Sequence, residues 1–280
     1  MVRGPDAQAY QHAHRAWMLD RVFASVDSRG CRTVVEIGCG DGGNCDVMSD
    51  RFEHVVGFDI NLHRLRRPVR PNVLLVGGDA DRMPIGAASA DLVISVALME
   101  HMPDRVAAFR QFATLVKPGG KCIHIAPVAP WKVFQWALFV PETIRKYAAS
   151  LLRTLAGERR QKQFATNPRA GTGRGGTAAG ETNNPRRVRK KVWYRKLVPR
   201  VHGEYETNWD EFRQWRVAAW RRQVEEAGLQ VVQQVKLGCA SPYGFGLSLA
   251  LGRLRGLGLH TVVAFVVAPA DSEATGAPVS

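Results

Sequence analysis

Short runs rich in valine and isoleucine alternate along the chain with segments of helical periodicity and with turn residues. Near-continuous apolar runs of this length are typical of strands in a parallel sheet that is covered on both faces. The predicted strands are residues 33–37, 54–58, 73–76, 91–96, 121–126, 229–235 and 261–268. This alternation predicts an α/β fold with a doubly wound, mostly parallel sheet.

Two predicted helices are delimited by their end residues. Pro103 begins a helical pattern that the Pro118–Gly120 turn ends. Further along, Asn208 with Glu211 three residues later has the spacing of a capping box, for a helix that ends at Gly228. Both helices fall between predicted strands, as the alternation requires.

Composition narrows the class of protein. The chain has 280 residues, 45% of them hydrophobic, which suits one large α/β domain with insertions. The five cysteines are odd in number and form no Cys-x-x-Cys pair, which argues against a disulfide framework and a metal site. No apolar run approaches the ~18 residues of a membrane-spanning helix, and the N-terminus does not resemble a signal peptide. We therefore expect a cytoplasmic protein.

The basic charge is concentrated in one segment. The net charge is +14, and residues 153–200 hold fourteen Lys or Arg and two acids, a net charge of +12. The basic balance therefore belongs to an insertion and not to the fold. Within that insertion, residues 161–184 are rich in glycine and poor in apolar side chains, which predicts a mobile loop.

A glycine-rich turn follows the first predicted strand. Gly38, Gly40 and Gly43 satisfy the spacing Gly-x-Gly-x-x-Gly, which lets the backbone approach a ligand closely. Asp59, at the end of the second strand, is placed to accept hydrogen bonds from ribose hydroxyls. These two features fit NAD and an adenosyl cofactor equally well.

Further features favour the adenosyl cofactor. Glu36 lies two residues before the first glycine, where a carboxylate suits a cationic cofactor and gives no advantage to a pyrophosphate. Asp79 and Ala80 follow the third strand, where a carboxylate can receive an adenine amino group. Residues 91–101 then lead into a helix that residues 117–121 close. An enzyme that uses a nicotinamide cofactor is therefore the least favoured alternative.

These segments, in this order, resemble the successive motifs of class I S-adenosylmethionine-dependent methyltransferases, and most closely the small-molecule and glycan methyltransferases. The resemblance covers residues 33–126. The motifs that carry it are Glu36-Ile37-Gly38-Cys39-Gly40, Asp59, Asp79-Ala80, Ala90-Asp91-Leu92-Val93 and Leu115-Val116-Lys117-Pro118-Gly119-Gly120. It implies S-adenosylmethionine as the cofactor and a seven-stranded Rossmann-like sheet whose antiparallel seventh strand is residues 261–268.

The resemblance also implies roles for individual residues. The methionine part of the cofactor would lie against Glu36, Gly38 and Gly40, the ribose against Asp59, the adenine against Asp79 and Ala80, and the sulfonium above Ala97 and Leu98. Cys39 and Ile60 complete the expected set of cofactor contacts.

The same reasoning divides the chain. We expect an N-terminal helical cap (1–30), a cofactor-binding domain (31–126 and 204–270), a partly flexible lid and basic insertion after the fifth strand (127–203) and a disordered tail (271–280). Residues 238–260 form an unusually long connection before the last strand. This connection departs from the family's pattern, at the sheet edge and beside the expected acceptor site.

Methyl transfer to a hydroxyl oxygen benefits from a general base. His101, which follows the fourth strand at the mouth of the cofactor crevice, is the first catalytic candidate; the alternative is that it orients the next helix. His202 and Tyr205 precede the capped helix and are the other catalytic candidates, against the alternative of an ordinary polar loop.

Apolar residues repeat at helical spacing from Ile144 to Leu155, with Arg145, Lys146 and Arg153 on the other side. The simplest interpretation is a lid helix packed over the cofactor domain. A second interpretation joins this helix to the basic segment 153–200 as a surface for an anionic membrane or a phosphate-bearing substrate. The same cations suit RNA phosphates, although the run of aromatic and apolar residues at 131–140 favours lipid.

The sequence therefore predicts an S-adenosylmethionine-dependent methyltransferase of biosynthesis. Its acceptor would be a hydroxyl oxygen of a small molecule or a lipid-linked glycan, and it would be cytoplasmic or peripheral to a membrane. Two alternatives stay open. One is an RNA methyltransferase that uses the basic insertion, and the other is a non-catalytic protein that binds adenosyl ligands.

Overall fold

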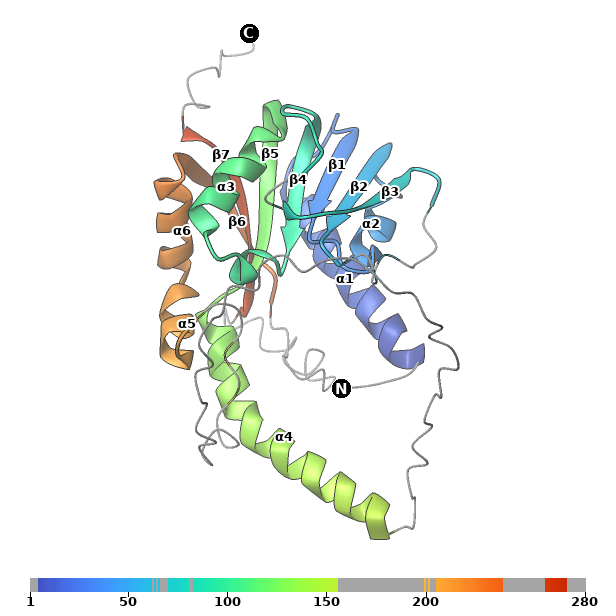
Figure 1. Cartoon of the computed structure of the whole chain (residues 1–280), viewed down its shortest axis with the longest axis vertical. Coiled ribbons are helices and arrows are strands. Elements are labelled where there is room, and N and C mark those ends of the chain that lie inside the picture. Colours follow the sequence, from blue (N-terminus) through green and yellow to red (C-terminus); the bar gives the residue numbers. More distant parts are fainter. Residues whose placement is uncertain are drawn as a thin grey trace, which may run out of the picture. The chain divides into compact units, whose positions relative to one another are not determined.

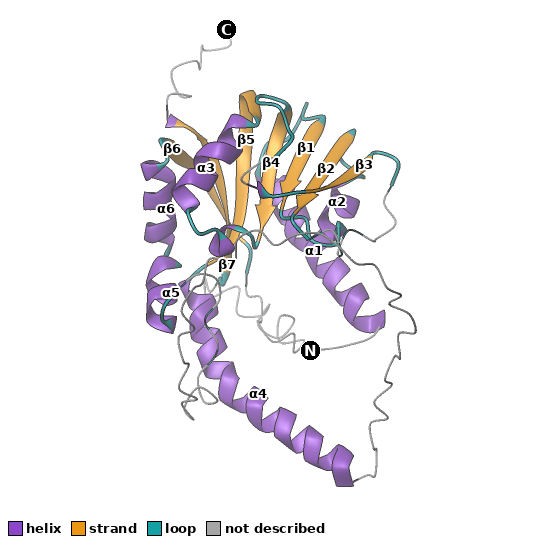
Figure 2. Cartoon of the chain, viewed as in Figure 1, coloured by secondary structure: helices purple, strands orange, loops and turns teal. Residues whose placement is uncertain are grey.

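A seven-stranded sheet with helices on both faces forms the body of the computed structural model (Figures 1 and 2). The structure describes residues 5–61, 63, 65, 70–80, 83–155, 199, 201, 205–238 and 260–270. The strands are β1 (Thr33–Ile37), β2 (His54–Asp59), β3 (Val73–Gly77), β4 (Ala90–Val96), β5 (Val116–Pro127), β6 (Leu229–Lys236) and β7 (Val262–Pro269). The helices are α1 (Pro5–Ser25), α2 (Gly43–Met48), α3 (Arg105–Thr114), α4 (Ala129–Leu155), α5 (Asn208–Gln214) and α6 (Val217–Glu226), with a short 3-10 turn η2 (Met99–His101).

The strand order is β3-β2-β1-β4-β5-β7-β6. β7 runs antiparallel to both of its neighbours, and the other pairs are parallel. The prediction of a mostly parallel doubly wound sheet with an antiparallel last strand is therefore confirmed. The strand order reverses between β1 and β4. Open α/β sheets bind ligands outside the carboxyl ends of the strands at such a point.

Two hydrophobic layers cover the sheet. On one face, Leu19 and Val22 of α1 are buried together with Cys45 and Met48 of α2. The other face holds the aromatic side chains of α3 and α6, among them Trp220. Each strand of the centre is buried on both faces, as its continuous apolar sequence requires.

The two predicted helix starts each shift. Asp104 caps α3, and its side chain accepts a hydrogen bond from the Ala107 backbone N–H at 2.9 Å. Thr207 caps α5 by accepting from the Asp210 backbone N–H at 3.0 Å, so the capping box expected at Asn208 is wrong. The physical reason is that the Glu211 carboxylate points into the core and is not available to cap the helix. The single helix predicted up to Gly228 is instead two helices, α5 and α6, and α6 ends at Glu226.

A buried ion pair attaches the start of α4 to α5. The Lys132 Nζ lies 2.6 Å from the Glu211 Oε2, and both side chains are 0% exposed. Burial lowers the pKa of Lys132, and the hydrogen bond and charge of Glu211 oppose that effect. The Ala129 backbone N–H also donates to the Trp215 carbonyl at 2.8 Å. The first turns of α4 are therefore fixed by polar contacts that water does not reach.

The contacts divide the chain into two compact units, residues 1–137 with 200–280, and residues 138–199. The first unit continues past the lid boundary that the sequence predicts at residue 126, and α4 runs from this unit into the second. No helix in the described ranges is long and apolar enough to cross a membrane. The loop predicted over residues 161–184 and the tail predicted over 271–280 lie outside the described residues.

Replacing Lys132 by Met leaves the Glu211 carboxylate buried without its cation. We expect the free energy of unfolding to fall by about 3–5 kcal/mol, because removal of one partner of a buried ion pair exposes the full desolvation cost of the other. Urea unfolding followed by circular dichroism measures the change. The double variant Lys132→Met/Glu211→Leu should recover most of the loss, and a double variant as unstable as the single one would contradict this account.

Candidate functional site

The carboxyl ends of β1, β2, β3 and β4 meet at one edge of the sheet. The register pairs Ile37 with Phe58 and with Ser95, and it pairs Asp59 with Gly77. The glycine turn, Asp59, Asp79 and Ala97 are therefore brought to the same edge, as their places after successive strands predict. Residues that are up to sixty positions apart in the chain thus lie at one edge of the sheet.

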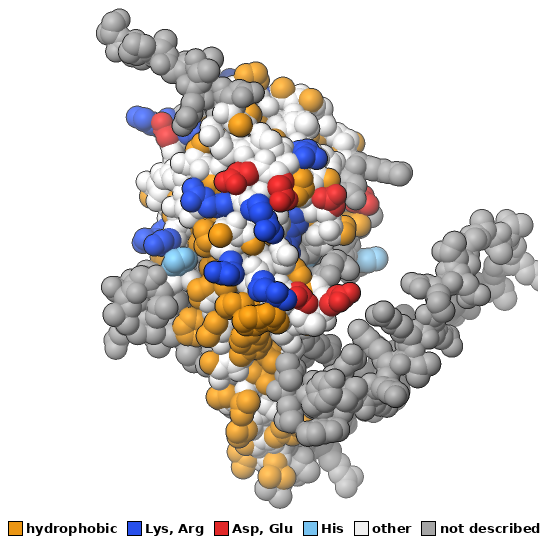
Figure 3. Space-filling view, turned by 90° about the vertical axis from the view of Figure 1, so that its left-hand side faces the viewer, with side chains coloured by type: hydrophobic (Ala, Val, Ile, Leu, Met, Phe, Trp, Pro, Cys, Tyr) orange, Lys and Arg blue, Asp and Glu red, His pale blue; other side chains and the backbone are white. Residues whose placement is uncertain are grey.

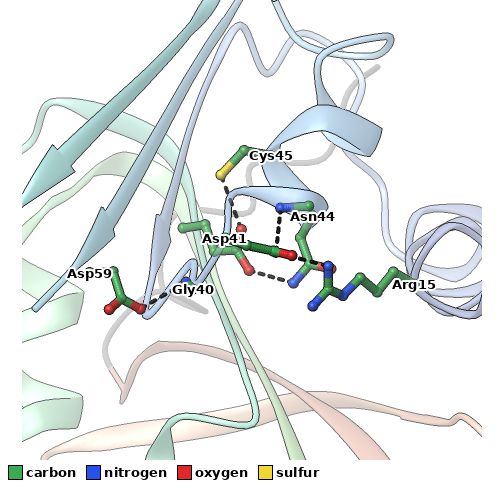
Figure 4. Close-up of polar contacts among 8 residues, drawn as sticks. Arg15, Gly40, Asp41, Asn44, Cys45 and Asp59 are labelled. Carbon is green, nitrogen blue, oxygen red and sulfur yellow. Dashed lines mark hydrogen bonds and ion pairs between the residues drawn. The ribbon is translucent and has the colours of Figure 1, made fainter. Parts of the chain in front are cut away.

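Backbone hydrogen bonds fix the glycine turn to β2. The Gly38 and Cys39 N–H groups both donate to the Phe58 carbonyl, at 2.7 and 3.1 Å. The Gly40 N–H donates to the Asp59 Oδ2 at 2.7 Å (Figure 4). Asp59 Oδ1 accepts in turn from the Asn61 N–H at 2.7 Å. Asp59 therefore holds the turn, while a carboxylate oxygen has lone pairs left for a ribose hydroxyl.

The turn needs glycine for two different reasons. Gly38 has φ +76°, and a Cβ on it would lie 2.8 Å from Leu98 Cδ1. Gly40 has φ +61°, and a Cβ on it would meet nothing within 4 Å. Gly38 is therefore required by packing against the end of β4, whereas Gly40 borders open space where a ligand can lie against the backbone.

Glu36 lies beneath the turn and is 0% exposed. Its carboxylate accepts from Asn44 Nδ2 at 2.6 Å and from Cys45 Sγ at 3.1 Å. Burial raises the pKa of Glu36 to about 7, against the lowering effect of these two hydrogen bonds. The carboxylate thus ties β1 to the first turn of α2, and its expected contact with the methionine part of the cofactor stays a prediction.

Asn44 is a site residue that the sequence did not reveal. Its side chain is buried, and its Oδ1 atom has no hydrogen-bond partner among the described residues. A buried acceptor without a donor is costly, so such an atom beside a ligand turn suits a donor on the ligand. The ammonium group of S-adenosylmethionine is a donor of that kind.

Arg15 reaches the turn from helix α1. Its Nη1 atom lies 2.9 Å from Asp41 Oδ1, which also accepts from the Gly43 N–H at 3.0 Å (Figure 4). The two side chains are 31% and 46% exposed. The sequence does not indicate this contact, because it arises only from the packing of α1 beside α2.

The remaining predicted cofactor residues differ in exposure. Cys39 is 4% exposed and packs in the core below the turn, so only its backbone faces the crevice edge. Ile60 is 71% exposed, and Asp79 is exposed as well. Ala80 is half-buried, and its carbonyl accepts from Gln111 Nε2 at 2.8 Å. The exposed apolar Ile60 beside Asp59 fits contact with a flat adenosyl group.

Ala97 adopts a strained backbone conformation at the end of β4. Its φ is +51°, in the left-handed region that residues other than glycine seldom adopt. The Ala97 N–H donates to the Ile125 carbonyl at 2.9 Å, which holds the turn in place. Such strain is concentrated at functional sites. It supports the position of Ala97 at the floor of the expected pocket.

A cavity of about 610 Å³ lies between η2, the start of α3, α5 and α6. Its lining includes Glu100, Arg105, Tyr205 and Asp210. Tyr205 Oη accepts from Trp215 Nε1 at 3.0 Å, and the Arg105 guanidinium lies 5.0 Å from the centre of the Tyr205 ring. The structure thus brings the predicted candidate Tyr205 beside the residues that follow β4.

Glu100 is the second candidate site residue whose chemistry the sequence did not indicate. It is 5% exposed, and its Oε2 atom has no hydrogen-bond partner in the part of the chain that the structure describes. Burial raises its pKa to about 7, and the nearby charge of Arg105 opposes this. The same burial lowers the pKa of Arg105 to about 10. Glu100 can therefore change its protonation state near neutral pH.

The other catalytic candidates are less constrained. His101 is exposed on η2, directly after Glu100. His202 lies outside the described residues. Within the described ranges, no group of His, Cys, Asp and Glu side chains could hold a metal ion.

The family comparison agrees with this geometry. Residues 35–124 match the model of a methyltransferase domain family, and this stretch contains the glycine turn, Asp59, Asp79 and Ala97. This part of the chain is a class I S-adenosylmethionine-dependent methyltransferase domain. S-adenosylmethionine is accordingly the cofactor, and its contact with the glycine turn stays a prediction.

Three curated relatives show the extent of the likeness. A Mycolicibacterium smegmatis S-adenosylmethionine-dependent methyltransferase is 30% identical over 98 residues, which are 34% of this chain and 38% of that one. Ubiquinone biosynthesis O-methyltransferases of Stutzerimonas stutzeri and Xanthomonas oryzae are 34% and 32% identical, over 32% and 39% of this chain and 42% and 48% of theirs. The chain therefore matches less than half the length of these relatives.

Solved structures show the same fold over most of the chain. A Haloferax volcanii methyltransferase solved with its activator has a TM-score of 0.52 at 15% identity, and the match covers 94% of this chain and 96% of that one. A Mesorhizobium loti S-adenosylmethionine-dependent methyltransferase has a TM-score of 0.50 at 15% identity, with 90% and 97% covered. At this identity the likeness concerns the fold alone.

Gly40→Ala should weaken cofactor binding without an unusual loss of stability. The added methyl group meets no atom of the protein but occupies the open space where the cofactor would lie. Calorimetric titration with S-adenosylhomocysteine should show a Kd that is higher by at least about tenfold, which corresponds to a loss of about 1.4 kcal/mol in binding free energy. The matched control is Gly30→Ala, at φ +79° with nothing within 4 Å. It carries a similar backbone strain, and affinity lost equally in both variants would contradict the assignment.

Glu36→Gln should change how stability depends on pH. The pKa of Glu36 is about 7 in the folded protein and 4.5 ordinarily. The stability that its protonated form supplies is therefore complete below pH 4.5 and is lost as the pH rises through about 7. This loss amounts to about 3 kcal/mol and is absent in the variant. Urea unfolding at several pH values measures the difference between the two proteins. Glu100 is present in both, so its similar titration cancels, and a difference that is independent of pH would contradict the prediction.

Proposed function

We propose that the protein transfers the methyl group of S-adenosylmethionine to a hydroxyl oxygen of a small molecule or a lipid-linked glycan. The observation that carries this proposal is that the glycine turn and the cavity meet at the end of β4. Leu98 packs on Gly38 of the turn, and Glu100, two residues later, lines the cavity. Cofactor and acceptor sites would then lie on either side of one short segment.

The residues at the turn fit the adenosyl cofactor. Gly40 leaves open space along the backbone, Asp59 offers carboxylate oxygens, and Asn44 offers a buried acceptor. Bound there, S-adenosylmethionine would supply a methyl group on a positively charged sulfur. The protein's part is then to hold the acceptor oxygen in line and to exclude water, which contributes much of the rate in displacements of this kind.

A hydroxyl acceptor must also lose its proton. His101 is proposed as the group that takes it, because it presents an exposed imidazole on η2 shortly after β4, and imidazole is the side chain that most often acts as a general base. Glu100, with its pKa near 7, lies next to it and would retain or release a proton over the same pH range. Tyr205, whose hydroxyl is held by Trp215, would contact the acceptor.

The names of the relatives support oxygen as the atom that is methylated, since two of those described are O-methyltransferases of ubiquinone biosynthesis. The matches cover less than half of each relative's length, and the choice of acceptor rests on the cavity. The two alternatives, an RNA methyltransferase and a non-catalytic binder, make different predictions in the same assay.

His101→Gln should lower kcat by roughly a hundredfold or more, because a general base contributes about 10²–10⁴ to such a rate. The affinity for S-adenosylhomocysteine should stay within about twofold, because His101 is not among the residues argued to hold the cofactor. The assay measures S-adenosylhomocysteine release with water-soluble phenols, a glycolipid extract and bulk RNA as separate acceptors.

The outcomes separate the hypotheses. Turnover with phenols or glycolipids that His101→Gln abolishes supports the proposal, and equal turnover in wild type and variant removes His101 from the mechanism. Turnover with RNA alone favours the RNA methyltransferase. Tight cofactor binding without turnover on any acceptor favours the non-catalytic protein. Tyr205→Phe serves as the comparison variant, and it should change KM for the acceptor more than kcat.

A further inference from the structure

The part of α4 beyond residue 137 exposes a row of large apolar side chains. Val140, Ile144, Tyr147 and Leu151 are spaced by four, three and four residues, so they lie along one side of the helix. Their exposed fractions are 55%, 63%, 68% and 60%. Figure 3 shows hydrophobic side chains following this helix along its length. We refer to these four residues as the α4 stripe.

Such a row is unusual for a helix that has water on that side. Single exposed apolar residues are common on protein surfaces, but a continuous apolar row marks a surface that docks on something. Its one-sided pattern differs from that of a spanning helix, which is apolar all round. The stripe therefore calls for an apolar surface that is contacted from one side only.

Charge indicates which surface that is. The chain passes directly from α4 into residues 153–200, whose net charge is +12. Clustered cations beside a one-sided apolar helix are the combination that binds anionic lipid headgroups and the acyl boundary together.

A second copy of the chain fits this charge poorly. Pairing of two α4 stripes would bring two segments of +12 into the same neighbourhood, and juxtaposed like charges oppose association. An anionic bilayer has the opposite sign and offers apolar depth for the stripe. An anionic bilayer therefore complements both the apolar α4 stripe and the positive charge that follows it in the sequence.

We propose that the α4 stripe docks in the interface of an anionic lipid bilayer, with the helix lying along the membrane plane. This inference is independent of the methyl transfer proposed above. It would nevertheless explain how an enzyme with a lipid-linked acceptor reaches its substrate.

The test is co-sedimentation of the full chain with vesicles, without cofactor or acceptor. Vesicles of phosphatidylcholine alone are compared with vesicles that also contain phosphatidylglycerol. We expect binding to be at least about tenfold stronger with the anionic lipid and to weaken at high salt. Val140→Glu and Ile144→Glu should each weaken it by roughly tenfold or more, because each places a carboxylate in the interface.

Val232→Glu on β6 is the matched control, because it makes the same change at another exposed valine, 46% exposed. It should bind vesicles within about twofold of the wild type, and S-adenosylhomocysteine titration shows that each variant is folded. Failure of the wild type to bind anionic vesicles overturns the proposal. So does equal binding by all variants, which would assign the adsorption to charge alone. A dimer in light scattering that Val140→Glu converts to a monomer, without vesicle binding, would make a second copy the occupant. None of these results affects the methyl-transfer assay, so the two proposals fail separately.

Discussion

The attachment of the glycine turn to the end of β2 is the constraint on which the candidate site depends. Two backbone N–H groups donate to the Phe58 carbonyl, and the next donates to the Asp59 carboxylate. This arrangement fixes the end of β1 against the end of β2, and it leaves the Gly40 side of the turn open. Asp59 is therefore both the residue that shapes the turn and the residue expected to meet the ribose.

Three buried glutamates show how one residue type takes different roles through its surroundings. Glu211 is paired with Lys132 and so joins two helices. Glu36 receives hydrogen bonds from Asn44 and Cys45 and so joins a strand to the turn helix. Glu100 has an oxygen without a hydrogen-bond partner among the described residues, and it lines the cavity. A buried carboxylate that is not fully compensated is costly for folding, and one that also lines a cavity is a candidate for chemistry.

Helix α4 combines two environments in one element. At its start, Lys132 is completely buried and the backbone is bonded to Trp215. Further along, apolar side chains such as Ile144 and Tyr147 are more exposed than buried. The helix is thus anchored at one end by contacts that exclude water, while its later turns present a surface that the described protein leaves uncovered. This contrast is the basis of the proposed docking of α4 on a bilayer.

The sequence alone determined the strands and their class, and it also determined that the glycine turn and Asp59 lie at one edge of the sheet. Alternating apolar runs are a local property, and each predicted strand lies within a residue or two of the observed one, apart from the early start of β5 at Val116. The glycine turn and Asp59 follow the same local logic, because parallel strands deliver their ends to one edge. The concentration of positive charge in residues 153–200 is likewise a property of the sequence itself.

Only the tertiary structure decided which distant side chains meet. Arg15 beside Asp41, Tyr205 beside Arg105, and Lys132 beside Glu211 are contacts across 26, 100 and 79 positions. No periodicity encodes them, because they arise from the packing of whole helices against the sheet. The capping box expected at Asn208 shows the same limit. Local spacing predicted that the Glu211 carboxylate caps the helix, whereas it pairs with the buried Lys132, which is distant in the sequence.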